Sequence, residues 1–462
     1  MTAAFLPLPG TRPLVVGAAR SGLAAARLLR RRGLKVRLAD RRFAEPDGTE
    51  LARQLGRQGA ADEFVADRPA ALDGCDFVVW SPGIPVGHPL AVSARAAGVP
   101  LLSELELGYR VAHAPFLCVT GTNGKSTTVD LIGALLRGSG RRVEVCGNIG
   151  RAVCEMAEEV DPTGFLVVEV SSFQLETVEH LRPLVAVWLN LTPDHLDRHG
   201  DLATYGAIKQ RLFARQQPGD WAVWNADDPE VLARRAGAGE PLFFSSRAAV
   251  AHGAYAGESG LTLVRPTGAE SLLPARELRL RGGHNRSNVL AALAAVLPLD
   301  LPADALRRVL RAYPGLEHRL EPVATVEGVE FVNDSKATNL GSLEVALESF
   351  EQPVVLIAGG RGKGQDFRPL ASRVARSVAH LVLIGEAAET IAAAWPEVPA
   401  TPAPSLVEAV ATAFERARGA TPPRTVLLSP GCASFDMFHD YEDRGRRFKE
   451  EVRRLKPQEA RT

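Results

Sequence analysis

Apolar and polar positions alternate along the first hundred residues in a strand–helix rhythm. In "RPLVVGAARSGLAAARLLRRRGLKVRLAD", a short apolar run predicts a strand, the glycines a turn and the amphipathic stretch a helix, before a second strand that ends at Asp40. "CDFVVWSPGIP" predicts a third strand with a turn at its carboxyl end. This order of elements is typical of an α/β domain.

Two further groups of strands and helices follow along the chain. Near "ELELGYRVAHAPFLCVT" a second strand–turn–helix unit begins, and its later runs "GFLVVEV" and "PLVAVWLNLT" are typical of buried parallel strands. Residues 218–280 contain more Gly, Pro and short alternating runs, which indicates a smaller antiparallel sheet. "NRSNVLAALAAVL" predicts a helix, and a third set of strands comprises "GVEFVND", "PVVLIAGG", "HLVLIG" and "TVLLSPG".

We therefore expect three α/β domains in series, each a mainly parallel sheet flanked by helices. They are expected to be Rossmann-like over residues 1–106, P-loop ATPase-like over 107–314 and Rossmann-like over 315–462. A chain of 462 residues exceeds what one ordinary core accommodates.

Composition narrows the class of protein. The 54 Lys and Arg residues balance 54 Asp and Glu residues, so no overall field favours nucleic acid or an anionic membrane. Five cysteines without a CxxC pair argue against structural zinc and suit a reducing cytoplasm. The longest apolar run, "VLAALAAVLPL", is too short to span a bilayer. We expect a cytoplasmic protein without membrane insertion.

A phosphate-binding loop is predicted at "CVTGTNGKSTTVDL". A strand over 115–119, a glycine turn and a helix from about Thr127 direct backbone N–H groups and the helix dipole at an anion. Lys125 adds charge, and Ser126 or Thr127 reaches a magnesium ion. Val119 occupies the position of the first glycine of the common P-loop, which argues against a GTPase or a standard P-loop kinase but not against ATP.

Carboxylate and imidazole groups follow two other strands. Glu169 ends "FLVVE", where a lone buried carboxylate is costly unless it is paired or metal-bound. "LNLTPDHLDRHG" supplies Asp194 and His195, whereas Asp197 and His199 are expected to be surface or capping residues. The i, i+4 spacing of the two histidines also fits a zinc pair, but the glutamate expected between them is absent.

The N-terminal turn "GAARSG" is a weak dinucleotide fingerprint. Ala19 replaces the glycine that lets backbone approach a pyrophosphate, so hydride transfer loses support. The alternative that this turn binds a nucleotide-linked substrate is retained, because Arg41 and Arg42 lie at the next strand end. A solvated run of arginines is the alternative.

The third domain carries a cationic group. Lys336 in "NDSKATN" and Lys363 in "GGRGKGQDF" follow strands, where open α/β sheets place ligands, and Arg319 lies in "EHRLE". The group suits an acidic substrate or a developing phosphate charge, and surface solvation is the alternative. Cys432 in "SPGCASFDMF" is expected to be a packed thiol, since no paired His–Asn arrangement supports a nucleophile.

Several motifs together resemble the muramyl ligase family. They are "TGTNGKST", "CGNIG", "EVSSFQLE", "LNLTPDHLDRH", "GGHNRSN", "EHRLE", "NDSKATN", "GGRGKG" and "SPGCASFDMF", in order from about residue 14 to 448. "GTNGKS" alone is shared with folylpolyglutamate synthases, whereas "SSFQLE", "DSKATN" and "SPGCASFDMF" are similar to the members that add D-glutamate. The resemblance implies a ligase of peptidoglycan synthesis that uses ATP, UDP-N-acetylmuramoyl-L-alanine and D-glutamate through an acyl phosphate, and we expect it to be a monomer.

The resemblance also implies roles for residues of the central domain. Lys125 would bind the β- and γ-phosphates, with Ser126 and Glu169 on one Mg²⁺. His195 would bind a second Mg²⁺, bridged by a carbamate on Lys209, which by its position alone would be a solvated helix lysine. The remaining nucleotide contacts would be Gly121, Thr122, Asn123, Gly124, Thr127, Asn285, Asn288, Arg319 and Asp334.

Substrate contacts are implied in the same way. Lys336 would meet the transferred phosphoryl group and Asn148 the muramoyl substrate. D-Glutamate would be held by Thr338, Lys363, Ser434 and Tyr441, where a phenylalanine stands in some members, and the uridine end by Arg20, Ser21, Arg41, Arg42 and Ser81 of the "SPGI" turn. The alternatives are another ligase of the superfamily, such as folylpolyglutamate synthase, and a nucleotide-binding regulator without turnover, which would require a broken metal or phosphate site.

Overall fold

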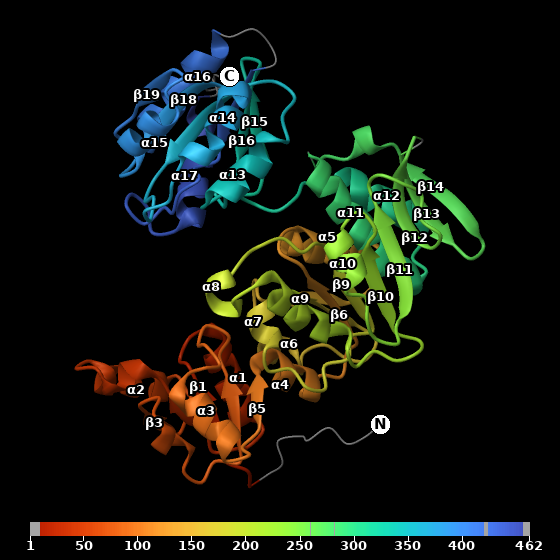
Figure 1. The fold of residues 1–462 in the computed structure, drawn as a ribbon, viewed down its shortest axis with the longest axis vertical. Coiled ribbons are helices and arrows are strands. Elements are labelled where there is room, and N and C mark those ends of the chain that lie inside the picture. Colours follow the sequence, from red (N-terminus) through yellow and green to blue (C-terminus); the bar gives the residue numbers. More distant parts are fainter. Residues whose placement is uncertain (1–9, 259, 281, 420–423, 456–462) are drawn as a thin grey trace, which may run out of the picture. The chain divides into compact units, whose positions relative to one another are not determined.

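The structure is a computed structural model that describes residues 10–258, 260–280, 282–419 and 424–455. It divides into two compact units, which are described separately. The first comprises Met1–Glu277 and Ser287–Arg311, and the second comprises Leu278–Arg286 and Ala312–Thr462. Figure 1 labels their helices and strands.

The N-terminal part of the first unit is a five-stranded parallel sheet. The strand order is β3-β2-β1-β4-β5. The strands are β1 (Pro13–Val16), β2 (Arg37–Ala39), β3 (Glu63–Val65), β4 (Phe77–Trp80) and β5 (Leu101–Ser103). The helices are α1 (Arg20–Arg31), α2 (Gly48–Arg57), α3 (Pro89–Ala96) and α4 (Glu104–Val111).

Both faces of this sheet are covered, which explains its continuous apolar strands. Val15 and Val79 pack in one apolar cluster with α1, while their neighbours Leu14 and Val78 pack in another with α3. Gly17 follows β1 with φ +97°, and a side chain there would lie 2.6 Å from Ser81 Oγ. The turns after β1 and β4 therefore lie against each other at the carboxyl ends of their strands.

The central part of the first unit is a nine-stranded sheet of order β14-β13-β12-β11-β10-β9-β6-β8-β7. Its strands are β6 (Phe116–Thr120), β7 (Val143–Gly147), β8 (Phe165–Glu169), β9 (Val185–Trp188), β10 (Trp221–Asn225), β11 (Glu240–Ser245), β12 (Gly253–Gly257), β13 (Gly260–Arg265) and β14 (Gly268–Leu273). Only β12, β13 and β14 pair antiparallel, whereas β10 and β11 extend the parallel part. The expectation of a smaller antiparallel sheet over 218–280 was wrong in its extent, because β10 and β11 pair in parallel with their neighbours and join the antiparallel strands to the parallel part.

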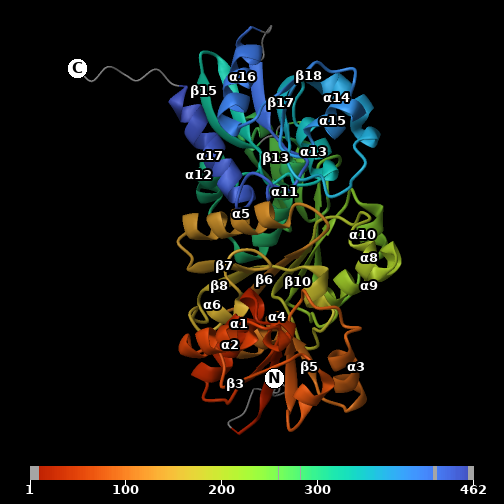
Figure 2. The same ribbon diagram turned by 90° about the vertical axis from the view of Figure 1, so that its left-hand side faces the viewer.

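Helices pack on this sheet and position the loops at its carboxyl edge. They are α5 (Lys125–Gly138), α6 (Val153–Met156), α7 (Ser172–Leu175), α8 (Leu196–His199), α9 (Leu202–Gln210), α10 (Pro229–Ala233), α11 (Gly283–Val296) and α12 (Ala303–Ala312). Helix α5 packs along β6, β7 and β8, and Figure 2 shows it beside β7. The core includes Trp188, Phe213 and Trp224, whose rings stack.

The second unit is a six-stranded sheet of order β15-β16-β20-β17-β18-β19. Its strands are β15 (Glu321–Val326), β16 (Val329–Asn333), β17 (Val354–Gly359), β18 (Val378–Ile384), β19 (Ala400–Pro402) and β20 (Arg424–Leu428). Its helices are α13 (Leu340–Leu347), α14 (Ala371–Ser377), α15 (Ala388–Ala394), α16 (Leu406–Arg418) and α17 (Tyr441–Arg454). All pairs are parallel except β15 with β16.

The predicted α/β class is thus confirmed for all three sheets. Within the part of the chain that the structure describes, no helix combines the length and apolar character needed to cross a membrane. The five cysteines are free thiols, of which Cys75 is half-buried and the other four are buried.

Candidate active site

The predicted phosphate loop connects β6 to α5. Gly121 and Gly124 both have left-handed backbone angles, with φ +151° and +85°, and Gly124 is the N-cap of α5. A side chain at Gly124 would collide with the Asn288 side chain from α11. The helix begins at Lys125, slightly earlier than expected, so its first N–H groups face the loop.

A second loop braces this one. The backbone N–H of Asn123 donates to Asn190 Oδ1 at 2.8 Å, and Asn190 Nδ2 donates back to the Asn123 carbonyl at 3.1 Å. Thr122 Oγ1 donates to the Thr192 carbonyl at 3.1 Å. Asn190 was not predicted, although its position two residues after β9 in "LNLT" was a signal.

Lys125 folds over the loop that precedes it. Its Nζ donates to the carbonyls of Gly121 at 2.9 Å and Thr122 at 2.8 Å. Ser126 and Thr127 are buried in the first turn of α5. The loop thus brings together a helix N-terminus, an ammonium group and two hydroxyls, as an anion site with a cation requires.

Glu169 is buried at the end of β8, with 2% of its surface exposed. Its Oε1 accepts a hydrogen bond from Asn148 Nδ2 at 2.8 Å. Its Oε2 is buried and has no hydrogen-bond partner among the described residues. A buried carboxylate oxygen without a donor is costly, so the side chain fits a bound cation such as Mg²⁺.

His195 is half-exposed on the loop after β9. It has a left-handed φ of +52°, its ring lies 4.9 Å from that of Phe173, and its Nε2 lies 3.5 Å from Asp194 Oδ2. Asp197 is exposed, as expected. Among the residues described, no three His, Cys, Asp or Glu side chains are grouped to hold a metal.

His199 does not lie at the surface, and that expectation was wrong. Its Nε2 lies 3.0 Å from Ser172 Oγ, and its ring stacks on Tyr205 at 5.2 Å. Burial lowers the pKa of His199. The reason is that α8 packs against α9, a tertiary contact that the local pattern does not encode.

Lys209 on α9 is also buried, with 1% of its surface exposed. Its position alone predicted a solvated lysine, and that interpretation was wrong. Its Nζ donates to the Gly121 carbonyl at 3.0 Å, which also accepts from Lys125, and lies 4.5 Å from the Tyr205 ring centre. Burial lowers the pKa of Lys209 well below its ordinary value, and the charge of Lys125 lowers it further.

The residues predicted to bind the uridine end of the substrate lie near the carboxyl ends of β1, β2 and β4. Ser81 is buried against Gly17, Ser21 is half-buried and Arg41 is exposed. Arg42 donates to the Ala18 carbonyl at 2.8 Å and to the Asp40 carboxylate. Burial raises the pKa of Asp40, but hydrogen bonds from Arg42 and Ala18 outweigh burial and lower it.

Arg20 points elsewhere. Its guanidinium donates to the carbonyls of Asn148 at 2.9 Å and Gly150 at 2.8 Å, in the "GNIG" loop. It therefore links the first turn of the N-terminal sheet to the residue that bonds Glu169.

In the second unit, three of the residues predicted to bind D-glutamate lie on loops that follow neighbouring strands. Thr338 follows β16, Ser434 follows β20 and Lys363 follows β17. The Gly431 N–H donates to the Ala337 carbonyl at 2.9 Å, and the Arg361 N–H donates to the Ala433 carbonyl at 2.8 Å. These bonds join the three loops at one edge of the sheet. Ser434 is buried, Thr338 is half-buried and Lys363 is exposed.

Lys336 and Tyr441 contact each other directly. The ammonium lies 3.7 Å from the Tyr441 ring centre, a cation–π contact. The Tyr441 hydroxyl donates to Glu442 at 2.9 Å. Burial, followed by the hydrogen bond to Glu442, raises the pKa of Tyr441 to about 12.

Asp334 is buried between two donors. It accepts from Ser429 Oγ at 2.7 Å and from the Leu320 N–H at 3.2 Å, and burial raises its pKa to about 7. Of the other predicted nucleotide contacts, Asn285 and Asn288 are buried three residues apart on α11, and Arg319 is half-buried.

A fully buried arginine that was not predicted from the sequence holds two of these loops together. Arg444 of α17 donates to Ser335 Oγ at 2.9 Å, the Ser335 carbonyl at 2.8 Å and the Cys432 carbonyl at 3.1 Å. Cys432 is buried, and burial raises its pKa to about 11, so its thiol is packed rather than nucleophilic, as expected.

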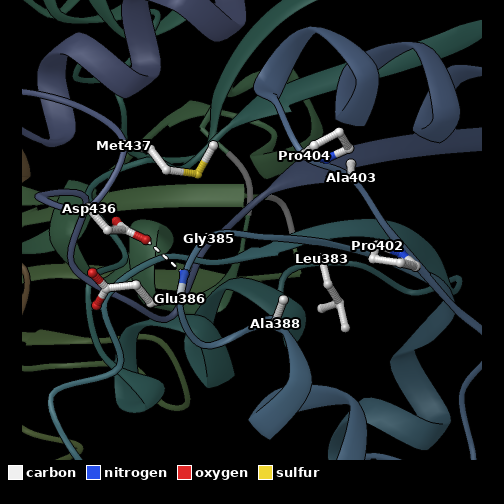
Figure 3. A pocket seen from close by; sticks show the side chains of 9 residues that line it. All are labelled: Leu383, Gly385, Glu386, Ala388, Pro402, Ala403, Pro404, Asp436 and Met437. Atoms are coloured by element: carbon white, nitrogen blue, oxygen red, sulfur yellow. Dashed lines mark hydrogen bonds between the residues drawn. The ribbon is translucent and has the colours of Figure 1, made fainter.

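A separate hollow of about 520 Å³ lies beside the carboxyl end of β18 (Figure 3). Its lining includes Leu383, Pro402, Met437 and Asp436, whose Oδ2 accepts from the Glu386 N–H at 3.0 Å. None of the predicted site residues lines it.

Three family models match in order along the chain. They are "Mur ligase MurD-like, N-terminal domain" over residues 11–103, "Mur ligase middle domain" over 119–296 and "Mur ligase, glutamate ligase domain" over 318–432. Each match covers one of the three sheets described above.

Known relatives match over nearly the whole length. The chain is 44% identical to UDP-N-acetylmuramoylalanine–D-glutamate ligase of Pelotomaculum thermopropionicum, covering 96% of this chain and 97% of the relative. It is 42% identical to the ligase of the same name from Myxococcus xanthus, covering 97% and 100%.

Solved structures share the fold at lower identity. A pseudomurein peptide ligase type C from Methanothermus fervidus aligns with a TM-score of 0.58 at 17% identity, covering 97% of this chain and 100% of that one. UDP-N-acetylmuramate–alanine ligase from Thermotoga maritima aligns with a TM-score of 0.56 at 18% identity, covering 96% and 100%.

Proposed function

Because the chain belongs to the Mur ligase family, we propose that it joins D-glutamate to UDP-N-acetylmuramoyl-L-alanine in peptidoglycan synthesis. The γ-phosphoryl group of ATP passes to the carboxylate of the nucleotide-linked substrate, which gives an acyl phosphate and ADP. The amine of D-glutamate attacks the acyl carbon, and phosphate leaves with the electrons of the C–O bond while the nitrogen loses a proton. Activation is needed because a carboxylate is a poor electrophile.

The observation that carries this proposal is the buried Oε2 of Glu169 near the phosphate loop, which has no hydrogen-bond partner in the part of the chain that the structure describes. A cation there has one carboxylate ligand already ordered by Asn148. Ser126 and Glu169 would hold one Mg²⁺, which would supply positive charge against the phosphates. His195 and a carbamate on Lys209 would hold a second.

The burial of Lys209 supports the proposed carbamate. Burial and the nearby charge of Lys125 favour the neutral amine. A neutral amine attacks CO₂, forming an N–C bond and releasing one proton to solvent, and the product is an anionic oxygen ligand. The same carbonyl of Gly121 that orders Lys209 also orders Lys125.

The remaining residues divide by ligand. Lys125 and the loop Gly121–Thr127 hold the β- and γ-phosphates, Asn285, Asn288, Arg319 and Asp334 position the nucleotide, and Lys336 meets the transferred phosphoryl group. Thr338, Lys363, Ser434 and Tyr441 hold D-glutamate, since a dicarboxylate needs charge with hydroxyl donors. Asn148 meets the muramoyl substrate, and Arg20, Ser21, Arg41, Arg42 and Ser81 meet the uridine end.

Each of the three sheets belongs to a domain that binds a different substrate. Residues 1–106 bind the UDP-linked substrate, 107–314 bind ATP and 315–462 bind the amino acid. The enzyme acts in the cytoplasm as a monomer.

Phosphate release measures the reaction directly. The chain is incubated with ATP, Mg²⁺ and UDP-N-acetylmuramoyl-L-alanine and with one amino acid at a time: D-glutamate, L-glutamate, L-lysine, L-alanine or diaminopimelate. Release that depends on D-glutamate alone is expected. The proposal would be overturned in favour of folylpolyglutamate synthesis if ATP released no phosphate with this nucleotide but released it with a folate and L-glutamate.

A further inference from the structure

Arg198 joins the two halves of the first unit at the candidate site. It lies three residues after His195, in α8, and its backbone N–H donates to the His195 carbonyl at 3.1 Å. Its side chain is 11% exposed, and its guanidinium carbon lies 4.2 Å from the centre of the Phe173 ring. The same ring lies 4.9 Å from that of His195. Arg198 thus contacts both the backbone and the ring neighbour of His195.

The far end of the guanidinium reaches the N-terminal sheet. Nη1 donates to the Pro82 carbonyl at 2.9 Å and Nη2 to the Ile84 carbonyl at 3.2 Å, in the turn after β4. Trp80 Nε1 donates to the same Ile84 carbonyl at 2.8 Å. Ser81 begins this turn, and its backbone N–H donates to the Val16 carbonyl of β1. This is the turn that the proposed function assigns to the nucleotide-linked substrate.

A carboxylate fixes the orientation of this arginine. Nε donates to Glu176 Oε1 at 2.8 Å and Nη2 donates to Glu176 Oε2, while the Glu176 side chain is 6% exposed. A bidentate pair holds the guanidinium plane, so the remaining donors point at Pro82 and Ile84. Lysine would keep the charge but lacks the planar fork.

We propose that Arg198 is a positioning residue that aligns the "SPGI" turn with the His195 loop and so places the substrate carboxylate for phosphoryl transfer. This role rests on the proposed function and adds a residue to it. Misplacement of a reacting group by about 1 Å costs roughly 100-fold in rate, so the precision of this link matters for catalysis. D-Glutamate is assigned to the second unit and does not depend on it.

The test compares Arg198→Lys with Arg182→Lys. Arg182 makes a similar bidentate pair, with Asp220 at 2.6 and 3.2 Å; the Asp220 side chain is also 6% exposed, whereas the Arg182 side chain is 37% exposed. That pair precedes β9 and β10, at the amino ends of the strands rather than the carboxyl ends. Arg182→Lys is therefore a control for replacing a guanidinium that makes a bidentate pair with a carboxylate.

For Arg198→Lys we expect kcat/KM for UDP-N-acetylmuramoyl-L-alanine to fall roughly 10- to 100-fold, with a higher KM for this substrate. The KM values for ATP and D-glutamate should change by less than about twofold, since their sites keep their own contacts. Arg182→Lys should keep all three KM values. A second variant, Glu176→Gln, keeps the arginine but weakens its orientation, and should give a smaller loss of the same kind.

Three outcomes would overturn the inference. One is wild-type kinetics in Arg198→Lys. Another is an equal rise of all three KM values together with a lower melting temperature, which would indicate a general structural role. The third is the same kinetic loss in Arg182→Lys. Absence of D-glutamate-dependent phosphate release by the unmodified chain would instead overturn the proposed function, on which the inference rests.

Discussion

Asn148 donates its side-chain N–H to one carboxylate oxygen of Glu169, at 2.8 Å, and the other oxygen is buried without a hydrogen-bond partner among the described residues. The backbone repeats the link, because the Asn148 N–H donates to the Glu169 carbonyl at 2.9 Å. The carboxylate is therefore oriented on one side only. An asymmetric environment of this kind leaves one lone-pair direction for a cation.

Glu169→Gln should separate metal binding from stability. The substitution removes a buried charge while keeping the shape, so the melting temperature without Mg²⁺ should stay equal or rise. The Mg²⁺ concentration for half-maximal activity should rise roughly 10- to 100-fold, as for the loss of other groups that order a metal site. Glu144→Gln on the adjacent strand β7 is the control, because that side chain is exposed. An unchanged Mg²⁺ requirement would contradict the assignment.

Lys209→Ala should lower kcat by roughly 100- to 1,000-fold, as for removal of a group that stabilises transition-state charge. Added acetate or formate should restore part of the rate if the lost group is a carbamate, because a small carboxylate supplies the same oxygen ligands. Activity with and without the added acid is measured against Lys35→Ala, an exposed lysine. Full activity without any added acid would disprove the role.

Gly124→Ala tests the shape of the phosphate loop. A methyl group there meets the Asn288 side chain and must also adopt φ +85°. Gly140→Ala is a matched control, since φ is +79° but nothing lies within 4 Å of the added carbon. Both should lose on the order of 1–2 kcal/mol from backbone strain. Only Gly124→Ala should also weaken ATP binding, measured by calorimetry; equal ATP affinity in both variants would contradict the predicted clash.

Glu104 should make stability depend on pH. Burial raises its pKa to about 7, although the Cys154 N–H donates to Oε1 at 2.6 Å. The folded chain therefore binds this proton more tightly than the unfolded chain, whose glutamate titrates near 4.5. The stabilisation is complete below about pH 4.5, falls as pH rises and is lost above about pH 7, with a total on the order of 3 kcal/mol.

Glu104→Gln removes this titration. Its melting temperature should exceed that of the unmodified chain at pH 8, whereas at pH 5 the difference should be much smaller. Thermal unfolding at several pH values measures this. Parallel curves for the two chains would show that Glu104 does not titrate in this range.

The strands could be predicted because parallel sheets covered on both faces have continuous apolar runs, as at "GFLVVEV" and "PVVLIAGG". The phosphate loop and Glu169 were also predictable, since their chemistry depends on positions directly after strands. The joining of β11 to β12 was not, because strand pairing is a long-range property.

Burial of polar side chains was the main failure of prediction from local pattern. Lys209 and His199 lie in polar segments, and their burial arises from packing of α8 and α9 near the phosphate loop. Arg198 and Arg444 bond to partners that are distant in sequence, so nothing near them indicates a role, whereas Asn190 could have been found from its position after β9. The family resemblance identified Lys209 because it compares whole motifs rather than local periodicity.

The distribution of thiols has a practical consequence. Four cysteines are buried, and burial raises the pKa of Cys118 and Cys154 well above the ordinary value, so Cys75 is the thiol most open to alkylation. Replacing Cys75 alone should give a chain whose remaining native thiols react little with a thiol-directed dye. Fluorescent dyes attached at newly introduced surface cysteines could then follow conformational change during turnover, without the multiple core substitutions that cysteine-free proteins usually require.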